Sequence, residues 1–343
     1  MAKDRALTGE EPDHRKRRRL LDAAAASVTA VDPEILAFQH SIFCQTGLPY
    51  RNPGPGIREW ERVNGRASLK VLAGEALDPK SMRWVPLGLP FGVKPRLILI
   101  HLASEAVRTG SPAVEVGDSV TAFTTRLLKR APIGPDIRLI KQQLAALAAA
   151  AIKIGFARTE DRATMLAAHI VERFDVWLPK DERQRVMWPT TIRLSHEFFT
   201  SLQGHAVPLD ERAVAALATS CMGLDTYCWL AQRLHRVPSG RPLLVPWEAL
   251  KLQFGWHYGR MVDFRRDFRQ ALVEVRTQYP DARFELDHRG MLLHHSPPPI
   301  RPKVVALPTP QDAASEAPGE TSSGPSSDAS AVDDGGHEGR LFT

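Results

Sequence analysis

The chain has 343 residues, is 43% hydrophobic and carries a formal net charge of +6, so it has room for two compact domains with real cores. Its three cysteines, Cys44, Cys221 and Cys228, are too few for a disulfide framework. The sequence has no apolar run of about 18 residues to span a membrane and no signal-peptide core. We therefore expect a cytoplasmic protein without a membrane partner.

The charge is distributed unevenly along the chain. The first 300 residues hold 42 basic and 32 acidic side chains, a net charge of +10, and the remaining 43 residues are acidic. A region this basic favours a polyanionic partner, most commonly nucleic acid. Solubility alone would also explain the charge, because net charge discriminates weakly between the two.

Residues 1–35 are predicted to be a disordered basic arm, which contains a basic run from His14 to Arg19. The run could touch the DNA backbone, or it could be a solvated leader to the first helix. A first winged-helix-like domain is predicted over residues 36–187.

Within that first domain, three helices are followed by two strands. The apolar spacing predicts helices over Lys94–Arg108, Ser119–Arg130 and Asp136–Ala151, the last with Asp136 as its N-cap. Strand-like runs follow over Ile152–Arg158 and His169–Leu178. Helices followed by a β-hairpin are the order of elements in a winged helix.

The third of these helices is a candidate recognition helix. Its outer face begins with Arg138, Lys141 and Gln142, in the turns where a recognition helix meets base edges. Its second half, from Leu144 to Ala151, is almost entirely alanine and leucine. The helix could therefore read bases, or it could only pack and mediate dimerisation.

A second winged-helix domain is predicted over residues 188–300, and it includes a connecting helix. After the segment Trp188–Leu194, a helix is predicted from Ser195, and a long helix from Leu209 to His235. The broad apolar surface of the long helix indicates that it is buried. Such a helix would fix the spacing of the two domains on a duplex.

The clearest pattern in the chain predicts a helix-turn-helix followed by a β-hairpin wing. Helices are predicted over Trp247–Phe254 and Met261–Tyr279, separated by a turn at Gly255–Gly259. Strands over Arg283–Leu286 and Met291–His295 are joined by a turn that ends in glycine. This is the same order of elements as in the first domain, without obvious residue identity.

The second of these two helices has an apolar inner stripe and an arginine-rich outer face, as a helix in the major groove requires. Candidate DNA contacts from the helix and its start are Arg260, Arg265, Arg266, Arg269 and Arg276. Lys251 and His257, which precede the helix, are candidate contacts to the DNA backbone. In the alternative interpretation, the arginines pair with Asp263 and Asp267 and only solubilise the surface.

The folded region is predicted to end at Pro297–Ile300, because proline cannot continue a central strand. Beyond it, residues 301–343 form a predicted disordered acidic tail rich in Pro, Ser and Gly. The predicted fold class is α+β, mainly α with small β-hairpins, arranged as tandem winged-helix domains with disordered ends.

Several segments between roughly Trp60 and Ile300 carry a resemblance to a known family: Gly88–His101, Phe174–Lys180, Trp188–Ser195, His205–Asp210, Asp225–His235, Asp263–Phe268 and Ser296–Ile300. They resemble the plasmid-encoded RepA family of replication initiators from proteobacteria. The resemblance implies binding to repeats at a plasmid origin and recruitment of host replication proteins such as a helicase or its loader. It implies no intrinsic nucleotide chemistry. By looser analogy, initiators of the iteron type use two winged-helix domains, which matches the predicted order of elements.

Catalytic interpretations fail on specific chemistry, so we expect a binding protein without cofactor or metal. Gly88–Lys94 lacks the spacing of a phosphate-binding loop, and its prolines remove backbone donors. His294 and His295 would face opposite sides of a strand and could not chelate one metal ion. Asp263 and Asp267 lie among arginines and fit ion pairs better than two-metal chemistry.

Two functions remain open from the sequence. The first is a plasmid replication initiator that binds double-stranded DNA at origin repeats and could act as a homodimer. The second is a winged-helix transcription regulator that only represses a promoter. Fold and charge do not separate them, and the family resemblance favours the first.

Overall fold

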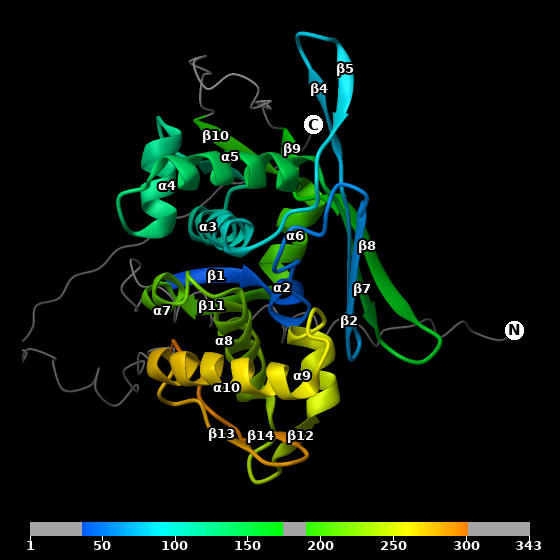
Figure 1. Cartoon of the computed structure of the whole chain (residues 1–343), viewed down its shortest axis with the longest axis vertical. Coiled ribbons are helices and arrows are strands. Elements are labelled where there is room, and N and C mark those ends of the chain that lie inside the picture. The colour runs from blue at the N-terminus through cyan, green and yellow to red at the C-terminus, as the bar shows by residue number, and fades with distance from the viewer. Residues whose placement is uncertain (1–35, 174–189, 301–343) are drawn as a thin grey trace, which may run out of the picture. The chain divides into compact units, whose positions relative to one another are not determined.

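The computed structural model describes residues 36–173 and 190–300, which lie in one compact unit. The predicted arm at residues 1–35 and the predicted tail at residues 301–343 lie outside the described residues. The fold is α+β, as predicted, but its sheets are more extensive than small hairpins (Figure 1).

The N-terminal part contains elements that the sequence did not reveal individually. They are β1 (Leu36–His40), α2 (Ser41–Gln45), β2 (Glu59–Asn64), β3 (Ala67–Leu72), β4 (Glu75–Asp78) and β5 (Arg83–Pro86). Strands β2 and β3 form a four-stranded sheet in the order β2-β3-β7-β8, whereas β4 and β5 pair only with each other.

The three helices predicted in the first domain are all present. They are α3 (Val93–Thr109), α4 (Val120–Leu128) and α5 (Gly134–Ala149), and the short strand β6 (Ala113–Glu115) lies between the first two. Ser119 caps α4 through its side chain. The prediction that Asp136 is the N-cap of α5 is wrong, because Asp136 is the third helical residue. Its carboxylate accepts a hydrogen bond from the backbone N–H of Ile133. The helix begins earlier because Pro135 suits a first turn.

The β-hairpin that follows α5 differs from the prediction in its second strand. Strand β7 (Ala151–Ala157) pairs antiparallel with β8 (Ala163–His169), and a short β9 (Val171–Arg173) comes after it. The loop between the two strands covers residues 158–162, so the second strand begins at Ala163 and the predicted start at His169 is wrong. The part of the predicted strand beyond Arg173 lies outside the described residues. Strand β8 is mostly exposed and has few large apolar residues, so hydrophobic patterning did not identify it.

The long predicted helix at Leu209–His235 is also wrong. The chain there forms β11 (Ala206–Asp210), α7 (Glu211–Ala216), α8 (Cys221–Arg233) and the single turn η2 (Leu234–Arg236). Two capping side chains divide the segment, since Asp210 caps α7 and Ser220 caps α8. Before them lie β10 (Thr191–Leu194) and α6 (His196–His205), which begins after Ser195 as predicted.

The C-terminal elements agree closely with the prediction. They are β12 (Leu243–Pro246), which was not predicted, α9 (Trp247–Phe254), α10 (Met261–Gln278), β13 (Phe284–Leu286) and β14 (Gly290–Leu293). The three strands form an antiparallel sheet in the order β12-β14-β13. Together with α8, this gives the order helix, strand, helix, helix, strand, strand.

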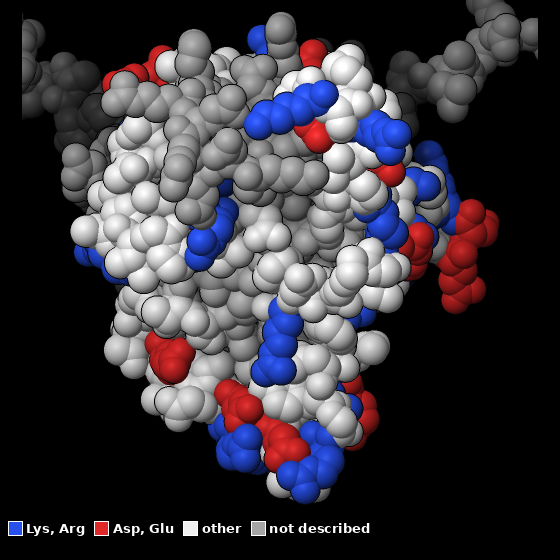
Figure 2. All heavy atoms as spheres, turned by 45° about the horizontal axis from the view of Figure 1, so that its top comes forward, with Lys and Arg blue, Asp and Glu red and all other residues white. Residues whose placement is uncertain are grey.

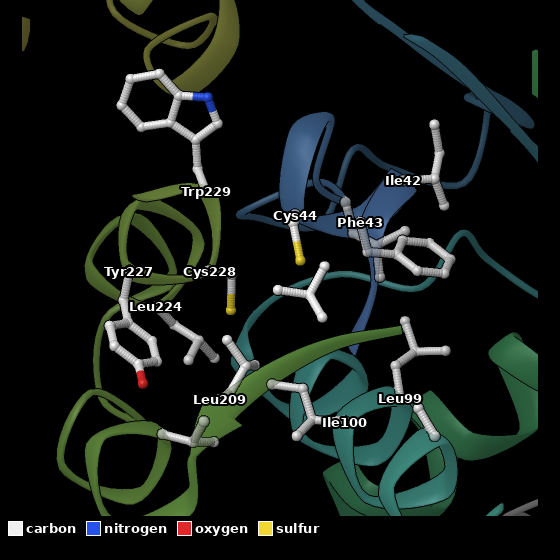
Figure 3. Packing of buried hydrophobic residues seen from close by; sticks show 14 of the residues in the cluster. Ile42, Phe43, Cys44, Leu99, Ile100, Leu209, Leu224, Tyr227, Cys228 and Trp229 are labelled. Atoms are coloured by element: carbon white, nitrogen blue, oxygen red, sulfur yellow. The ribbon is translucent and has the colours of Figure 1, made fainter. Parts of the chain in front are cut away.

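Contacts cross the predicted domain boundary between residues 187 and 188, which itself lies outside the described residues. Strand β1 pairs with β11, and β10 pairs with both β6 and β9. Elements α2, α3, β11 and α8 share one hydrophobic core (Figure 3). In this core Cys44 and Leu209 lie close to Cys228, and all three cysteines are unbridged. The division into two domains stays a prediction.

A buried ion pair joins helices from the two halves. Arg96 of α3 donates from Nε and Nη2 to the two carboxylate oxygens of Asp225 on α8, at 2.7 and 2.8 Å. The remaining donors of Arg96 reach the carbonyl oxygens of Leu48, Pro49 and Gly92. Each nitrogen of the Arg96 guanidinium thus has a hydrogen-bond acceptor, which offsets the cost of taking both charges out of water.

Removal of one partner of this pair is expected to destabilise the fold strongly. Asp225→Ala leaves the Arg96 guanidinium buried without its counter-ion, so the free energy of unfolding should fall by about 3–5 kcal/mol. Urea unfolding followed by circular dichroism measures the change. The double variant R96M/D225L should lose less than Asp225→Ala, because no charge remains buried. An equal or larger loss in the double variant would contradict this account.

Candidate nucleic-acid interface

Helix α10 is attached to the molecule by one apolar face. Phe264, Phe268, Leu272 and Val275 are buried, which confirms the predicted inner stripe. Phe264 and Phe268 pack against each other and against the indole ring of Trp247, the first residue of α9. The rest of the helix surface is left for polar side chains.

The turn between α9 and α10 depends on a close approach at Gly255. The backbone N–H of Gly255 donates to the carbonyl oxygen of Lys251 and ends α9. A Cβ atom at Gly255 would lie 2.3 Å from Cδ2 of Phe264. Only glycine lets the chain turn this tightly over the ring.

One side of α10, which we call the basic flank, consists of Arg265, Arg269 and Arg276. The guanidinium carbons of Arg265 and Arg269 lie 4.9 and 5.2 Å from the centre of the Trp247 ring. That of Arg276 lies 4.6 Å from the ring of Phe284, and its Nη2 donates to the carbonyl oxygen of Phe284. Cation–π contacts of this kind hold long side chains in place.

Trp247 links this flank to the β-hairpin of β13 and β14. Its indole N–H donates a hydrogen bond to the carbonyl oxygen of Asp287, at 2.9 Å. Its backbone N–H donates to the carbonyl oxygen of Arg289. Arg289 pairs with Asp287 in the turn of the hairpin. Among the described residues, neither Arg265 nor Arg269 forms an ion pair with a carboxylate, and Nε of Arg265 is buried without a hydrogen-bond partner.

The other arginines of α10 are paired with acidic side chains. Arg260 donates twice to Asp263, at 2.7 and 2.9 Å, and Arg266 contacts both Asp263 and Asp267. The hydrogen bond from Arg260 lowers the pKa of Asp263, and those from Arg266 and Tyr258 lower the pKa of Asp267. For these two arginines, the geometry matches the alternative in which they pair with carboxylates.

Lys251 and His257 lie on the N-terminal side of α10, as predicted. Lys251 is half-buried on α9. The ring of His257 lies 4.3 Å from that of Tyr258 and 5.5 Å from that of Tyr50. Burial and the nearby Arg51 charge lower the pKa of His257, so it is neutral at pH 7 and can offer a hydrogen bond, not a charge.

The candidate residues of the first domain lie at the start of α5. Arg138 and Gln142 are exposed and Lys141 is half-buried, whereas the alanine-rich second half of the helix is largely buried. Burial would raise the pKa of Asp136, but its hydrogen bonds from Lys94 and Arg130 lower it to about 2. In Figure 1, α5 and α10 lie well apart, so the two sets of candidates do not form one site.

A cluster at the turn before α10 was not found from the sequence. The guanidinium of Arg62, on β2, lies 3.8 Å from the ring centre of Trp60 and 5.1 Å from that of Trp256. The two indole rings are in edge contact at 4.8 Å. Since these residues are nearly 200 positions apart in the chain, no local pattern could have joined them.

Two further observations concern the described residues only. They contain no group of three or more His, Cys, Asp and Glu side chains that could hold a metal ion. None of their helices is long and apolar enough to cross a membrane.

On the face drawn in Figure 2, basic and acidic side chains are interspersed.

Gly255→Ala tests the tight turn. The added methyl group would clash with Phe264, so the variant should unfold at a lower temperature, with a loss of about 1–3 kcal/mol typical of overpacking. Gly259→Ala is the matched control, because a Cβ at Gly259 meets nothing within 4 Å. Equal melting temperatures for the two variants, measured by circular dichroism, would show that the close approach is not required.

Comparison with known proteins finds two similar structures and one family match. Two structures of domains 2 and 3 of RctB resemble the chain, with 11% and 10% identity and TM-scores of 0.43 and 0.41. They cover 69% and 66% of this chain and 83% and 80% of the RctB chains. No curated protein matches the sequence. Residues 89–248 match the family of plasmid-encoded RepA proteins. This match confirms the predicted resemblance to that family over the matched segment.

Proposed function

We propose that this protein initiates plasmid replication by binding double-stranded DNA at origin repeats. The match of residues 89–248 to the plasmid-encoded RepA family is the observation that carries the proposal. In this proposal the protein has no catalytic activity of its own and acts from the cytoplasm. It recruits host replication proteins, such as a helicase or its loader, to the origin.

In this proposal residues 221–293 form a winged helix with α10 as the recognition helix. Two features support it: the order α8, β12, α9, α10, β13, β14, and the strand order β12-β14-β13. Helix α10 follows a tight turn, buries one face and leaves the opposite face exposed. A helix held in this way can enter a major groove, and the β13–β14 hairpin would contact the adjacent backbone.

Arg265 and Arg269 are the proposed base contacts. They are four residues apart, so they share a side of the helix, and both are held over Trp247 without a carboxylate partner among the described residues. Arg260 and Arg266 would first have to leave Asp263 and Asp267. We assign Arg276, Lys251 and His257 to backbone contacts that position the helix.

The first domain is proposed to assist, with Arg138, Lys141 and Gln142 as contacts from the first two turns of α5. Its order of elements, α3, β6, α4, α5, β7 and β8, is similar to that of the second unit, although β7 pairs with β3 in a larger sheet. Strand β8 is an edge of that sheet and contains no Lys, Glu or Pro. Such an edge can pair with another chain, which supports a homodimer.

The basic flank gives a direct test of DNA binding. If Arg265 and Arg269 contact bases, each of the single variants Arg265→Ala and Arg269→Ala should lose about 1–3 kcal/mol of binding free energy for the origin repeats. Fluorescence anisotropy with a labelled duplex measures the affinity at fixed salt, because phosphate contacts make binding salt-dependent.

Arg266→Ala is the matched control on the same helix. Its guanidinium is exposed and already paired with two carboxylates, so its loss should change affinity less than either other variant. Wild-type affinity in the double variant R265A/R269A, with the fold intact, would rule out α10 as the reading helix.

Initiation and repression are separated by a plasmid that lacks its own initiator. A replication initiator supplied from a second plasmid should maintain it if the origin repeats are present, and R265A/R269A should not. A transcription repressor would bind the repeats and silence a reporter without supporting replication. This second outcome would leave the DNA-binding proposal standing and overturn the initiation role.

A further inference from the structure

The β4–β5 hairpin, which we call the ribbon (residues 75–86), exposes large apolar side chains at one end of the described structure. Figure 1 shows it extending past the neighbouring elements. Trp84 is 67% exposed, Met82 70% and Leu77 39%. Leu77 and Trp84 are direct partners in the strand register, so they lie on the same face. On the other face, Ala76 is only 2% exposed.

The base of the ribbon is firmly fixed. Arg58 donates from Nη1 to the carbonyl oxygen of Leu87, and from Nη2 to those of Ala73 and Gly74. These hydrogen bonds clamp both ends of the hairpin to the start of β2. A Cβ on Gly74 would lie 1.9 Å from the carbonyl oxygen of Ala149, so the base also packs tightly on the end of α5. The ribbon is therefore held in one direction.

The tip is shaped by Asp78, which is buried. Its carboxylate accepts hydrogen bonds from the N–H of Lys80 and the hydroxyl of Ser81. Met82 adopts φ +52°, a left-handed conformation that is costly for a residue other than glycine and is often found at functional sites. Thus a strained backbone presents an apolar side chain to solvent.

The exposed charges of the tip are basic. Lys80 and Arg83 are exposed. Asp78 is the only acidic residue between Ala76 and Pro86, and its carboxylate is hydrogen-bonded within the turn. Lys80 precedes Trp84 by four residues, and Arg83 is its neighbour in the strand with its side chain on the opposite face. An exposed indole flanked by cations in this way can hold an unpaired nucleotide, because the ring stacks on a base and the cations contact phosphates on either side of it. A base within an intact duplex offers no free π-face to a side chain.

We propose that the ribbon is a site for an unstacked DNA base, with Trp84 as the stacking platform and Lys80 and Arg83 as phosphate contacts. This inference deepens the proposed function and rests on it, because an initiator acts where duplex DNA is opened. The ligand comes from either a free single strand or an opened duplex. Met82 and Leu77 extend the apolar surface around the base.

The test uses the full chain and three labelled DNA probes that contain no origin repeats. They are an oligothymidine of about 12 nucleotides, within the range bound by single-strand sites, an intact duplex, and the same duplex with a central unpaired bubble. Anisotropy should show that Trp84→Ala weakens binding to the first or third probe about ten-fold and leaves the intact duplex unaffected. Trp84→Phe, which keeps an aromatic ring, should retain most of the affinity.

Two further variants separate stacking from charge. K80Q/R83Q should weaken binding and reduce the slope of log affinity against log salt by about 1.4, the value for two phosphates of a single strand. Met82→Gly should keep the fold, because glycine accepts a positive φ, and should weaken binding less than Trp84→Ala. Val63→Ala, at a side chain of β2 that is 53% exposed, is the matched control and should have no effect.

The outcomes distinguish this inference from the proposed function. Trp84-dependent binding of the oligothymidine alone identifies a free strand as the ligand, and binding of the bubble alone identifies an opened duplex. Unchanged binding in Trp84→Ala, or loss of a host protein from a pull-down with both DNA affinities intact, would overturn the inference. If R265A/R269A binds origin duplex normally while Trp84→Ala loses the bubble probe, the assignment of α10 fails and this one stands.

Discussion

The placement of the candidate DNA interface depends on the buried pair of Arg96 and Asp225. Two charges removed from water destabilise a fold unless their hydrogen-bonding capacity is satisfied. Here two donors of Arg96 are taken by Asp225 and the others by backbone carbonyl groups. Gly47, with φ +69°, lies so close that a Cβ would be 2.7 Å from the Asp225 carboxylate. The pair therefore fixes three chain segments at once.

From this pair, rigid contacts lead to α10. Asp225 lies on α8, which packs directly against α10. Tyr227 of α8 is in edge contact with Tyr279 at the end of α10, and Trp229 is in edge contact with Phe254 of α9. Aromatic contacts of this kind are directional. Both helices of the proposed reading unit are thus oriented by a helix that is itself anchored to the N-terminal half.

The sequence predicted the C-terminal unit well and the centre of the chain poorly. Phe264, Phe268 and Leu272 repeat at a clear helical spacing, so α10 was placed within one residue of its observed ends. The segment from Leu209 to His235 is also apolar, but Asp210 and Ser220 divide it by capping new helices. The pairing of β1 with β11 and the edge contact of Trp60 with Trp256 join distant residues, so local sequence patterns could not predict them. The contacts of Arg265 and Arg269 with Trp247 also join residues of different helices, so the spacing within α10 did not predict them.

The indole of Trp247 also affects the entropy of association. An arginine side chain free in solvent samples many rotamers, and its immobilisation at an interface costs about 0.5–1.5 kcal/mol. Arg265 and Arg269 rest on a ring that is itself hydrogen-bonded to the hairpin turn. Much of their rotational freedom is already lost when the protein folds. The free energy of their contacts to a ligand is therefore available for affinity and is not consumed in ordering the side chains.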